Sequence, residues 1–155
     1  MDGYGKRILV VEDDDDVRMI INITLTEAGY NVYEARDGLE AVESLKKRRY
    51  DAVLTDYHMP KMDGLELLDL AQAMWPRLPV ILASSDILLT ENISNTLLAP
   101  AYAVLCKPFD SRNLLETVRC ATRGIPKTLY EQSHTPKPSV KHRSDPRPFL
   151  AGRAT

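Results

Sequence analysis

Apolar residues in this chain gather in five short runs, and longer segments with helical spacing separate these runs. Short apolar runs between turn residues are typical of strands that are buried on both faces of a sheet. The predicted strands are Ile8–Val11, Asn31–Ala35, Ala52–Thr55, Val80–Ala83 and Ala101–Cys106. Because strands and helices alternate, the pattern predicts a parallel sheet that is covered by helices on both faces.

The segments between the runs carry apolar residues three and four positions apart, which indicates amphipathic helices. Asp37 before Glu40, and Asp63 before Glu66, have the spacing of a capping box and mark two helix starts. Helices are therefore predicted over residues 17–28, 38–45, 64–75, 88–98 and 111–123.

This order of elements fits a doubly wound five-stranded parallel sheet, (βα)5, of the flavodoxin-like type with strand order 2-1-3-4-5. In that fold, ligands bind where the carboxyl ends of strands 1 and 3 lie side by side. The length of 155 residues allows one such domain and a tail. We expect the domain over residues 5–123 and a disordered tail over 124–155, which holds half of the 10 prolines.

Charge is unevenly distributed along the chain. Residues 1–123 contain 20 acidic and 14 basic residues, whereas residues 124–155 contain 2 acidic and 6 basic residues. The acidic body argues against nucleic-acid binding, and we interpret the cationic run 46–49 as a solvated helix end. Without a long apolar stretch, a signal peptide or a disulfide framework, the sequence predicts a cytoplasmic protein with no membrane contact. Cys106 ends an apolar run, so we expect its side chain to be buried.

Polar side chains that suit phosphoryl chemistry follow the predicted strands. Glu12 and Asp13 follow the first strand, Asp56 follows the third, Ser84 the fourth and Lys107 the fifth. Carboxylates that lie this close repel one another, and a hard cation such as Mg²⁺ would offset the repulsion. A charged helix start explains the acidic run Glu12–Asp16 equally well on composition alone. The position of the run at a strand end favours a site.

An aspartate can act as a nucleophile toward phosphorus and so form an aspartyl phosphate. A metal ion and Lys107 would neutralise charge on the transferred group, and the hydroxyl of Ser84 would donate to one of its oxygens. Each of these residues also has an ordinary structural explanation when it is taken singly. Their coincidence at four strand ends is what predicts the site.

Three segments of the chain resemble the hallmark motifs of response-regulator receiver domains of the CheY-like superfamily. They are Ile8–Asp13, Asp56–Gly64 and Lys107–Phe109, and they occur in the family's order at the matching strand ends. The second segment, with Met-Pro and then Asp-Gly, is highly specific, whereas Lys-Pro-Phe alone is a weak signal. The resemblance covers about residues 5–123.

The resemblance implies a role for each matching residue. Asp56 would be the phosphoacceptor, and Lys107 would pair with the phosphoryl group. Mg²⁺ would be held by the carboxylates of Glu12, Asp13 and Asp56 and by the backbone carbonyl of His58. Ser84 would match the family's Ser or Thr that moves toward the phosphoryl group.

The resemblance also implies the biological role. Family members take a phosphoryl group from a phosphohistidine on a sensor histidine kinase or a histidine phosphotransfer protein. They also catalyse their own dephosphorylation, so the domain is a switch and not an enzyme in the usual sense. With no DNA-binding domain after Gly124, we expect output through a protein target that docks on the Leu88–Arg123 face.

One position departs from the family pattern. Members often carry Tyr or Phe three residues before the lysine, and this chain has Val104. Tyr102 lies two residues earlier in the same predicted strand, so the period of two places it on the same side as Val104, where it would substitute for the missing aromatic ring.

Two other functions compete with the receiver reading. The segment Asp13–Val17 fits the short motif of haloacid-dehalogenase-like phosphatases, with Asp13 as nucleophile, but this reading leaves Asp56–Gly64 unexplained. A third hypothesis is a pseudo-receiver that binds partners without being phosphorylated. Its only support is the departure from the family pattern at Val104. A flavin site is disfavoured because the loop after the first strand is acidic instead of glycine-rich.

Overall fold

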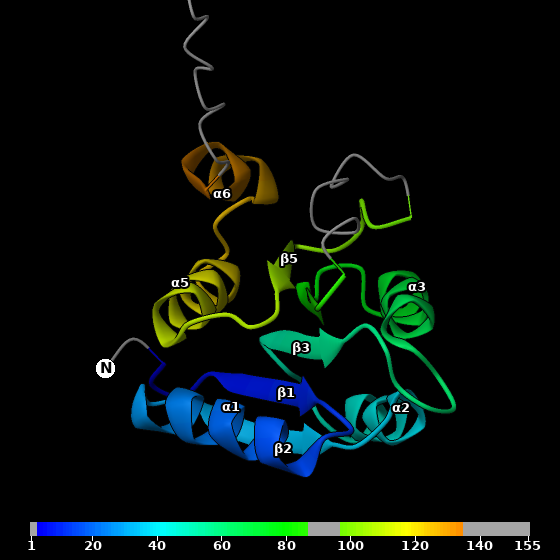
Figure 1. Ribbon diagram of the computed structural model, residues 1–155. Coiled ribbons are helices and arrows are strands. Elements are labelled where there is room, and N and C mark those ends of the chain that lie inside the picture. Colours follow the sequence, from blue (N-terminus) through cyan, green and yellow to red (C-terminus); the bar gives the residue numbers. More distant parts are fainter. Residues whose placement is uncertain (1–2, 87–96, 135–155) are drawn as a thin grey trace, which may run out of the picture.

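A computed structural model describes residues 3–86 and 97–134, which form a parallel sheet between two layers of helices (Figure 1). The strand order is β2-β1-β3-β4-β5, and every neighbouring pair is parallel. The strands are β1 Arg7–Val11, β2 Asn31–Ala35, β3 Ala52–Asp56, β4 Val80–Ser84 and β5 Ala103–Cys106. The predicted doubly wound, flavodoxin-like fold with order 2-1-3-4-5 is confirmed.

Aspartates cap the first turns of four helices. The side chains of Asp14, Asp37, Asp63 and Asp110 each accept hydrogen bonds from backbone N–H groups two or three positions later, as good N-caps do. The helices are α1 Asp15–Glu27, α2 Gly38–Lys47, α3 Gly64–Met74, α5 Ser111–Thr122 and α6 Lys127–His134. In the described part of the chain, no helix is long and apolar enough to cross a membrane. The helix predicted over 88–98 falls almost entirely outside the described residues.

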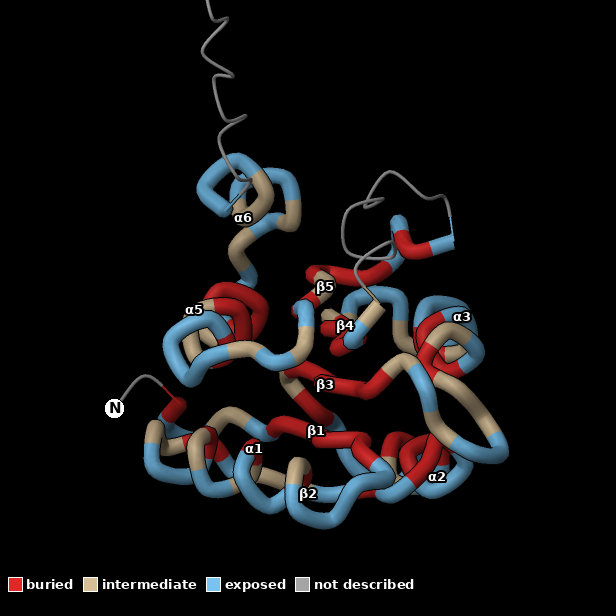
Figure 2. Tube along the Cα trace, in the orientation of Figure 1, coloured by how far each residue is buried: buried red, intermediate tan, exposed pale blue. Residues whose placement is uncertain are grey.

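Two apolar clusters form the core, one on each face of the sheet. Ile8 and Val10 of β1 pack with the buried faces of α1 and α5. Leu9 and Val11 point the other way and pack with α2 and α3. This alternation follows from the period of two along a strand. The central strands are therefore buried on both faces (Figure 2), and their carboxyl ends are held in fixed positions.

The chain after Gly124 differs from the expected disorder at one place. Lys127–His134 forms helix α6, which packs beside α5 (Figure 1). The hydroxyl groups of Tyr130 and Thr117 are 2.8 Å apart and share a hydrogen bond, and the Tyr130 ring packs against the ring of Tyr102. These tertiary contacts stabilise a helix that is too short to be stable by itself. Residues 135–155 lie outside the described part.

The fifth strand differs from the prediction in two respects. Tyr102 precedes β5, so the alternation of the strand does not include it. Its ring belongs to the cluster with α1 and α5, whereas Val104 packs on the other face. The expectation that Tyr102 replaces the aromatic ring missing at Val104 is therefore wrong. Cys106 was expected to be buried but is exposed, because it is the last residue of an edge strand.

Candidate functional site

The strand order brings three carboxylates together at the carboxyl ends of β1 and β3. Val11 pairs with Thr55, so Glu12 and Asp13 lie beside Asp56. Glu12 and Asp56 are buried, whereas Asp13 is exposed. The three side chains each offer an oxygen within 4.8 Å of the others. The structure thus assembles the predicted acidic cluster from residues that are more than forty positions apart in the sequence.

The ammonium group of Lys107 bridges two of these carboxylates. Its Nζ lies 2.8 Å from Oε2 of Glu12 and 3.2 Å from Oδ1 of Asp56. The backbone N–H of Lys107 donates to the carbonyl of Ser84 at 2.8 Å, which continues the pairing of β5 with β4. The sheet itself therefore aims the lysine across β4 toward the end of β3.

Burial and charge shift the pKa values of the bridged pair. Burial raises the pKa of Glu12, with a smaller contribution from the nearby Asp56 carboxylate, and these effects outweigh the hydrogen bond from Lys107. Burial lowers the pKa of Lys107, but its contacts with Glu12 and Asp56 outweigh burial, so the net shift is upward. The lysine is held in its charged form, while the crowded carboxylates still need further positive charge.

The donor set fits a hard divalent cation. Glu12, Asp13 and Asp56 offer carboxylate oxygens, the ligand type that Mg²⁺ prefers. Three carboxylates and one ammonium leave an excess of two negative charges in a partly buried space. A single Mg²⁺ would balance that excess. The role of the His58 carbonyl remains a prediction.

Two other predicted residues lie beside the cluster. Ser84 ends β4, and its buried Oγ accepts a hydrogen bond from the backbone N–H of Asp86 at 3.0 Å. It follows Ala83, the pairing partner of Asp56 on the neighbouring strand. His58 is exposed two residues after Asp56, and its ring packs edge-on against the ring of Tyr57. All the residues predicted from the sequence therefore lie at one edge of the sheet.

The loop between β3 and α3 explains the Asp-Gly pair of the motif. A Cβ on Gly64 would lie 2.3 Å from the carbonyl oxygen of Asp56, which no side chain tolerates. The glycine thus lets α3 begin directly against the strand end that presents Asp56. The same loop contains Lys61, whose φ of 68° is left-handed and whose Nζ reaches Asp37 at 3.3 Å. This contact ties the loop to the cap of α2.

Sequence reasoning missed Arg18. This buried residue of α1 donates from Nη1 to the backbone carbonyl of Glu12 at 2.8 Å, and it forms an ion pair with Asp15. It therefore holds both ends of the loop that carries the acidic run. A signal was present, because position 18 shares the spacing of the buried residues Ile21 and Leu25 and is filled by a cation.

Comparisons with known proteins agree with this geometry. A family model described as "Response regulator receiver domain" matches residues 8–119. Response regulator receiver protein CpdR of Brucella abortus is 37% identical over 114 residues, or 73% of this chain and 93% of that protein. Response regulator MprA of Mycobacterium sp. (strain KMS) is 37% identical over 117 residues, or 76% of this chain. The chain spans about half the length of the MprA relatives that it matches.

Solved structures show the same fold. Response regulator protein TrrA from Thermotoga maritima, in complex with Mg²⁺-BeF, has a TM-score of 0.69 and 29% identity, and the match covers 75% of this chain and 98% of that one. Chemotaxis response regulator CheY4 of Vibrio cholerae has a TM-score of 0.68 and 28% identity over the same shares. The chain belongs to the family of response regulator receiver domains, the phosphorelay modules of two-component signalling.

Proposed function

We propose that Asp56 is the phosphoacceptor of this receiver domain. A carboxylate oxygen of Asp56 attacks the phosphorus of a phosphohistidine on a sensor histidine kinase or a histidine phosphotransfer protein. The new P–O bond forms as the P–N bond breaks, and the histidine nitrogen takes up a proton. The product is an acyl phosphate on Asp56. A later attack by water on phosphorus restores the carboxylate and releases phosphate.

The observation that supports this most directly is the position of Lys107. Its ammonium lies 3.2 Å from Asp56, so it can neutralise a phosphoryl oxygen once one is attached. The hydroxyl of Ser84 now accepts a hydrogen bond from the backbone N–H of Asp86. After phosphorylation it would rotate away from this contact and donate to another phosphoryl oxygen. No salt bridge joins Lys107 to Asp13 among the described residues, which favours Asp56 over Asp13 as the nucleophile.

Glu12, Asp13 and Asp56, with the backbone carbonyl of His58, would hold Mg²⁺, which supplies positive charge to the phosphoryl oxygens when bound. The Mg²⁺-BeF bound by TrrA supports this choice of metal. The buried Glu12 keeps the cluster anionic at its inner side, and the exposed Asp13 leaves its outer side open. A phosphodonor can therefore approach from the solvent.

The surface beside the site suits a protein phosphodonor. A pocket of about 400 Å³ lies between α1 and the segment after β5, and it is lined by Ile20, Lys107 and Phe109 among others. Ile20 is 61% exposed, and Met19 and Ile23 of the same helix are also exposed. An exposed apolar patch next to the acceptor carboxylate is the kind of surface on which another protein docks.

The domain acts as a switch, and its chemistry is limited to accepting and losing one phosphoryl group. We place it in the cytoplasm, where it signals through a protein target on the Leu88–Arg123 face. Acidic residues outnumber basic residues in the segment 1–123, which supports a protein target and not a nucleic acid. Of this face, residues 97–123 belong to the described part.

The test is the intact mass of the purified protein after incubation with Mg²⁺ and acetyl phosphate. We expect a gain of one phosphoryl group that is absent without Mg²⁺ and absent in Asp56→Asn. A gain that persists in Asp56→Asn overturns the assignment and directs attention to Asp13. No gain in the wild type with several phosphodonors supports a pseudo-receiver instead.

A further inference from the structure

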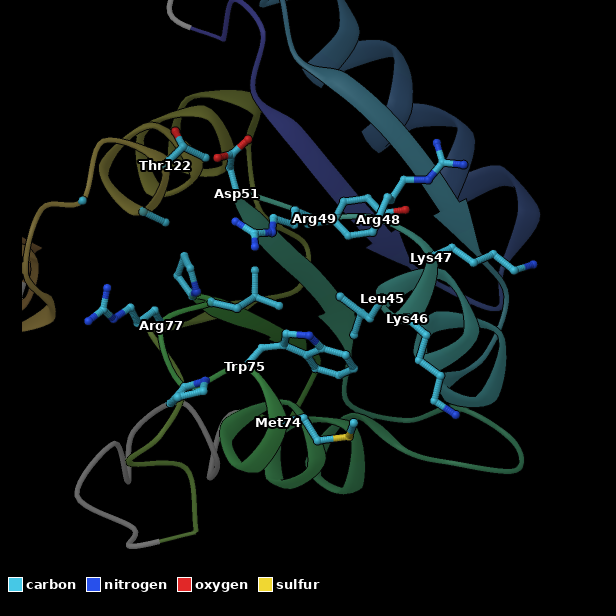
Figure 3. Close-up of a pocket in the computed structure, with 16 residues that line it drawn as sticks. Leu45, Lys46, Lys47, Arg48, Arg49, Asp51, Met74, Trp75, Arg77 and Thr122 are labelled. Carbon is cyan, nitrogen blue, oxygen red and sulfur yellow. The ribbon is translucent and has the colours of Figure 1, made fainter.

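A groove opens at the end of the sheet opposite the carboxylate cluster (Figure 3). Its volume is about 820 Å³, and its walls come from the ends of α2, α3 and α5. Asp51 and Pro79, the residues directly before β3 and β4, lie in it. Because all strands run in one direction, this groove lies at the amino ends of the strands, whereas Asp56 lies at their carboxyl ends. Its role is therefore separate from phosphoryl transfer.

The groove is lined mainly by cationic residues, although the domain as a whole has an acidic excess. Residues 1–123 contain 14 cationic and 20 acidic residues, yet five of those cations and one of those acids line this groove. The cationic residues are Lys46, Lys47, Arg48, Arg49 and Arg77. By its local pattern alone, the run 46–49 is a solvated helix end. The structure adds Arg77 from a different loop, so the charge surrounds a concave surface.

Several of these cations have no anionic partner in the part of the chain that the structure describes. Across residues 3–86 and 97–134, Lys47, Arg49 and Arg77 form no salt bridge. The one lining carboxylate, Asp51, accepts a hydrogen bond from the backbone N–H of Arg7 at 2.8 Å. Positive charge in the groove is thus largely uncompensated, and a ligand that carries carboxylates would compensate it.

The floor of the groove is apolar. Figure 3 shows the ring of Trp75 between the side chains of Leu45 and Met74, with Lys47 and Arg77 on opposite sides of the groove. Trp75 is only partly buried, and Met74 is 50% exposed. A half-buried tryptophan beside an exposed methionine inside a concave surface is typical of the centre of a protein interface.

We propose that this groove docks an acidic segment of a partner protein in which apolar residues alternate with carboxylates. The carboxylates would pair with the cationic rim, and the apolar side chains would cover Trp75 and Met74. The chain's own residues 124–155 do not fit, because they contain 6 basic and 2 acidic residues and would be repelled. A nucleic acid fits less well, because a long polyanion would also meet the acidic remainder of the domain.

The single tryptophan of the chain makes the groove directly observable. We would titrate the full chain with a short peptide of glutamate and leucine that has no aromatic residue, and follow the emission of Trp75. We expect the emission of Trp75 to change until the groove is saturated with peptide, and we expect the affinity to fall as the salt concentration rises. The same peptide with glutamine in place of glutamate should bind at least roughly tenfold more weakly.

Charge-reversal variants distinguish binding in this groove from general electrostatic attraction between the peptide and the protein. Arg49→Glu combined with Arg77→Glu should weaken peptide binding roughly tenfold or more. Arg36→Glu combined with Arg112→Glu is the matched control, because both residues are exposed, neither lines the groove, and the change in net charge is the same. Circular dichroism establishes that both double variants are folded.

Several outcomes would overturn the proposal. They are no change in emission at millimolar peptide, an equal loss of affinity in both double variants, and tighter binding of oligodeoxythymidylate than of the acidic peptide. The last result would assign the groove to a nucleic acid. Acceptance of a phosphoryl group by Asp56 is measured separately by intact mass, so failure of either proposal leaves the other standing.

Discussion

Arg18 holds the backbone of Glu12, with Nη1 of the guanidinium 2.8 Å from the carbonyl oxygen. This bond fixes the first residue of the acidic loop from the side of α1. We predict that Arg18→Ala lowers the free energy of unfolding by about 2 kcal/mol, because a buried carbonyl loses a charged donor. The substitution should also weaken Mg²⁺ binding. Urea unfolding and a Mg²⁺ titration measure the two effects.

Asp15→Asn is the control for Arg18→Ala. Asp15 is the exposed partner of the same arginine, and water screens such an ion pair, so it contributes little to stability. Arg18 also pairs with Glu34 at 3.6 Å, so a small effect of Asp15→Asn beside a large effect of Arg18→Ala would assign the stabilisation to the contacts with the Glu12 carbonyl and Glu34 together. Equal effects of the two substitutions on stability and Mg²⁺ affinity would contradict this account.

Gly64→Ala tests the close approach of α3 to the end of β3. The added Cβ would lie 2.3 Å from the carbonyl oxygen of Asp56, so the strand end must shift. We expect a loss of about 1–3 kcal/mol in stability, as for other overpacked sites, and slower phosphorylation of Asp56 because its backbone moves. Chemical denaturation and the rate of mass gain with acetyl phosphate provide the measurements.

Gly124→Ala is the matched control for Gly64→Ala. Gly124 has a φ of +71° at the end of α5, and a Cβ there would meet nothing within 4 Å. It should cost about 1 kcal/mol through backbone strain alone and leave the phosphorylation rate unchanged. If Gly64→Ala behaves in the same way, close packing against Asp56 does not explain the glycine.

Tyr102 makes stability depend on alkaline pH. Burial, and then the nearby Cys120 and Tyr130, raise the pKa of Tyr102 to about 12 from an ordinary 10.0. A raised pKa stabilises the folded protein only while the phenol is protonated. This contribution is complete below pH 10.0 and is lost as the pH rises through about 12.

Tyr102→Phe isolates this effect, because phenylalanine does not ionise. We expect the difference in unfolding free energy between wild type and Tyr102→Phe to fall as the pH rises from 9 to about 12. Below pH 9 the wild type should be more stable by about 1 kcal/mol, since Tyr102 donates a hydrogen bond to the carbonyl of Ile125. A difference that stays constant over this pH range would contradict the raised pKa.

Much of the fold and the site follows from the sequence because parallel sheets obey simple rules. Alternating elements predict a doubly wound parallel sheet, and the strand order of the flavodoxin-like type places the ends of β1 and β3 side by side. Glu12, Asp56 and Lys107 therefore come together from local positions alone, without knowledge of any long-range contact. Matches to family motifs then supply roles for these residues that spacing by itself does not.

Other features depend on tertiary contacts that a local pattern does not contain. Helix α6 has no buried residue, and its place depends on Tyr130 reaching Thr117 and Tyr102. The side on which Tyr102 lies depends on β5 beginning two residues later than the apolar run suggests. The groove around Trp75 joins the ends of three helices, so only the folded chain shows its charge.

Phosphorylation of Asp56 is tested most directly by locating the acyl phosphate itself. The protein is incubated with acetyl phosphate and Mg²⁺, reduced with borohydride, which converts an aspartyl phosphate to homoserine, and then sequenced by peptide mass spectrometry. The account predicts homoserine at position 56, dependent on Mg²⁺ and strongly reduced in Lys107→Ala. Homoserine at position 13 instead would contradict it, and would make Asp13 the nucleophile of this site.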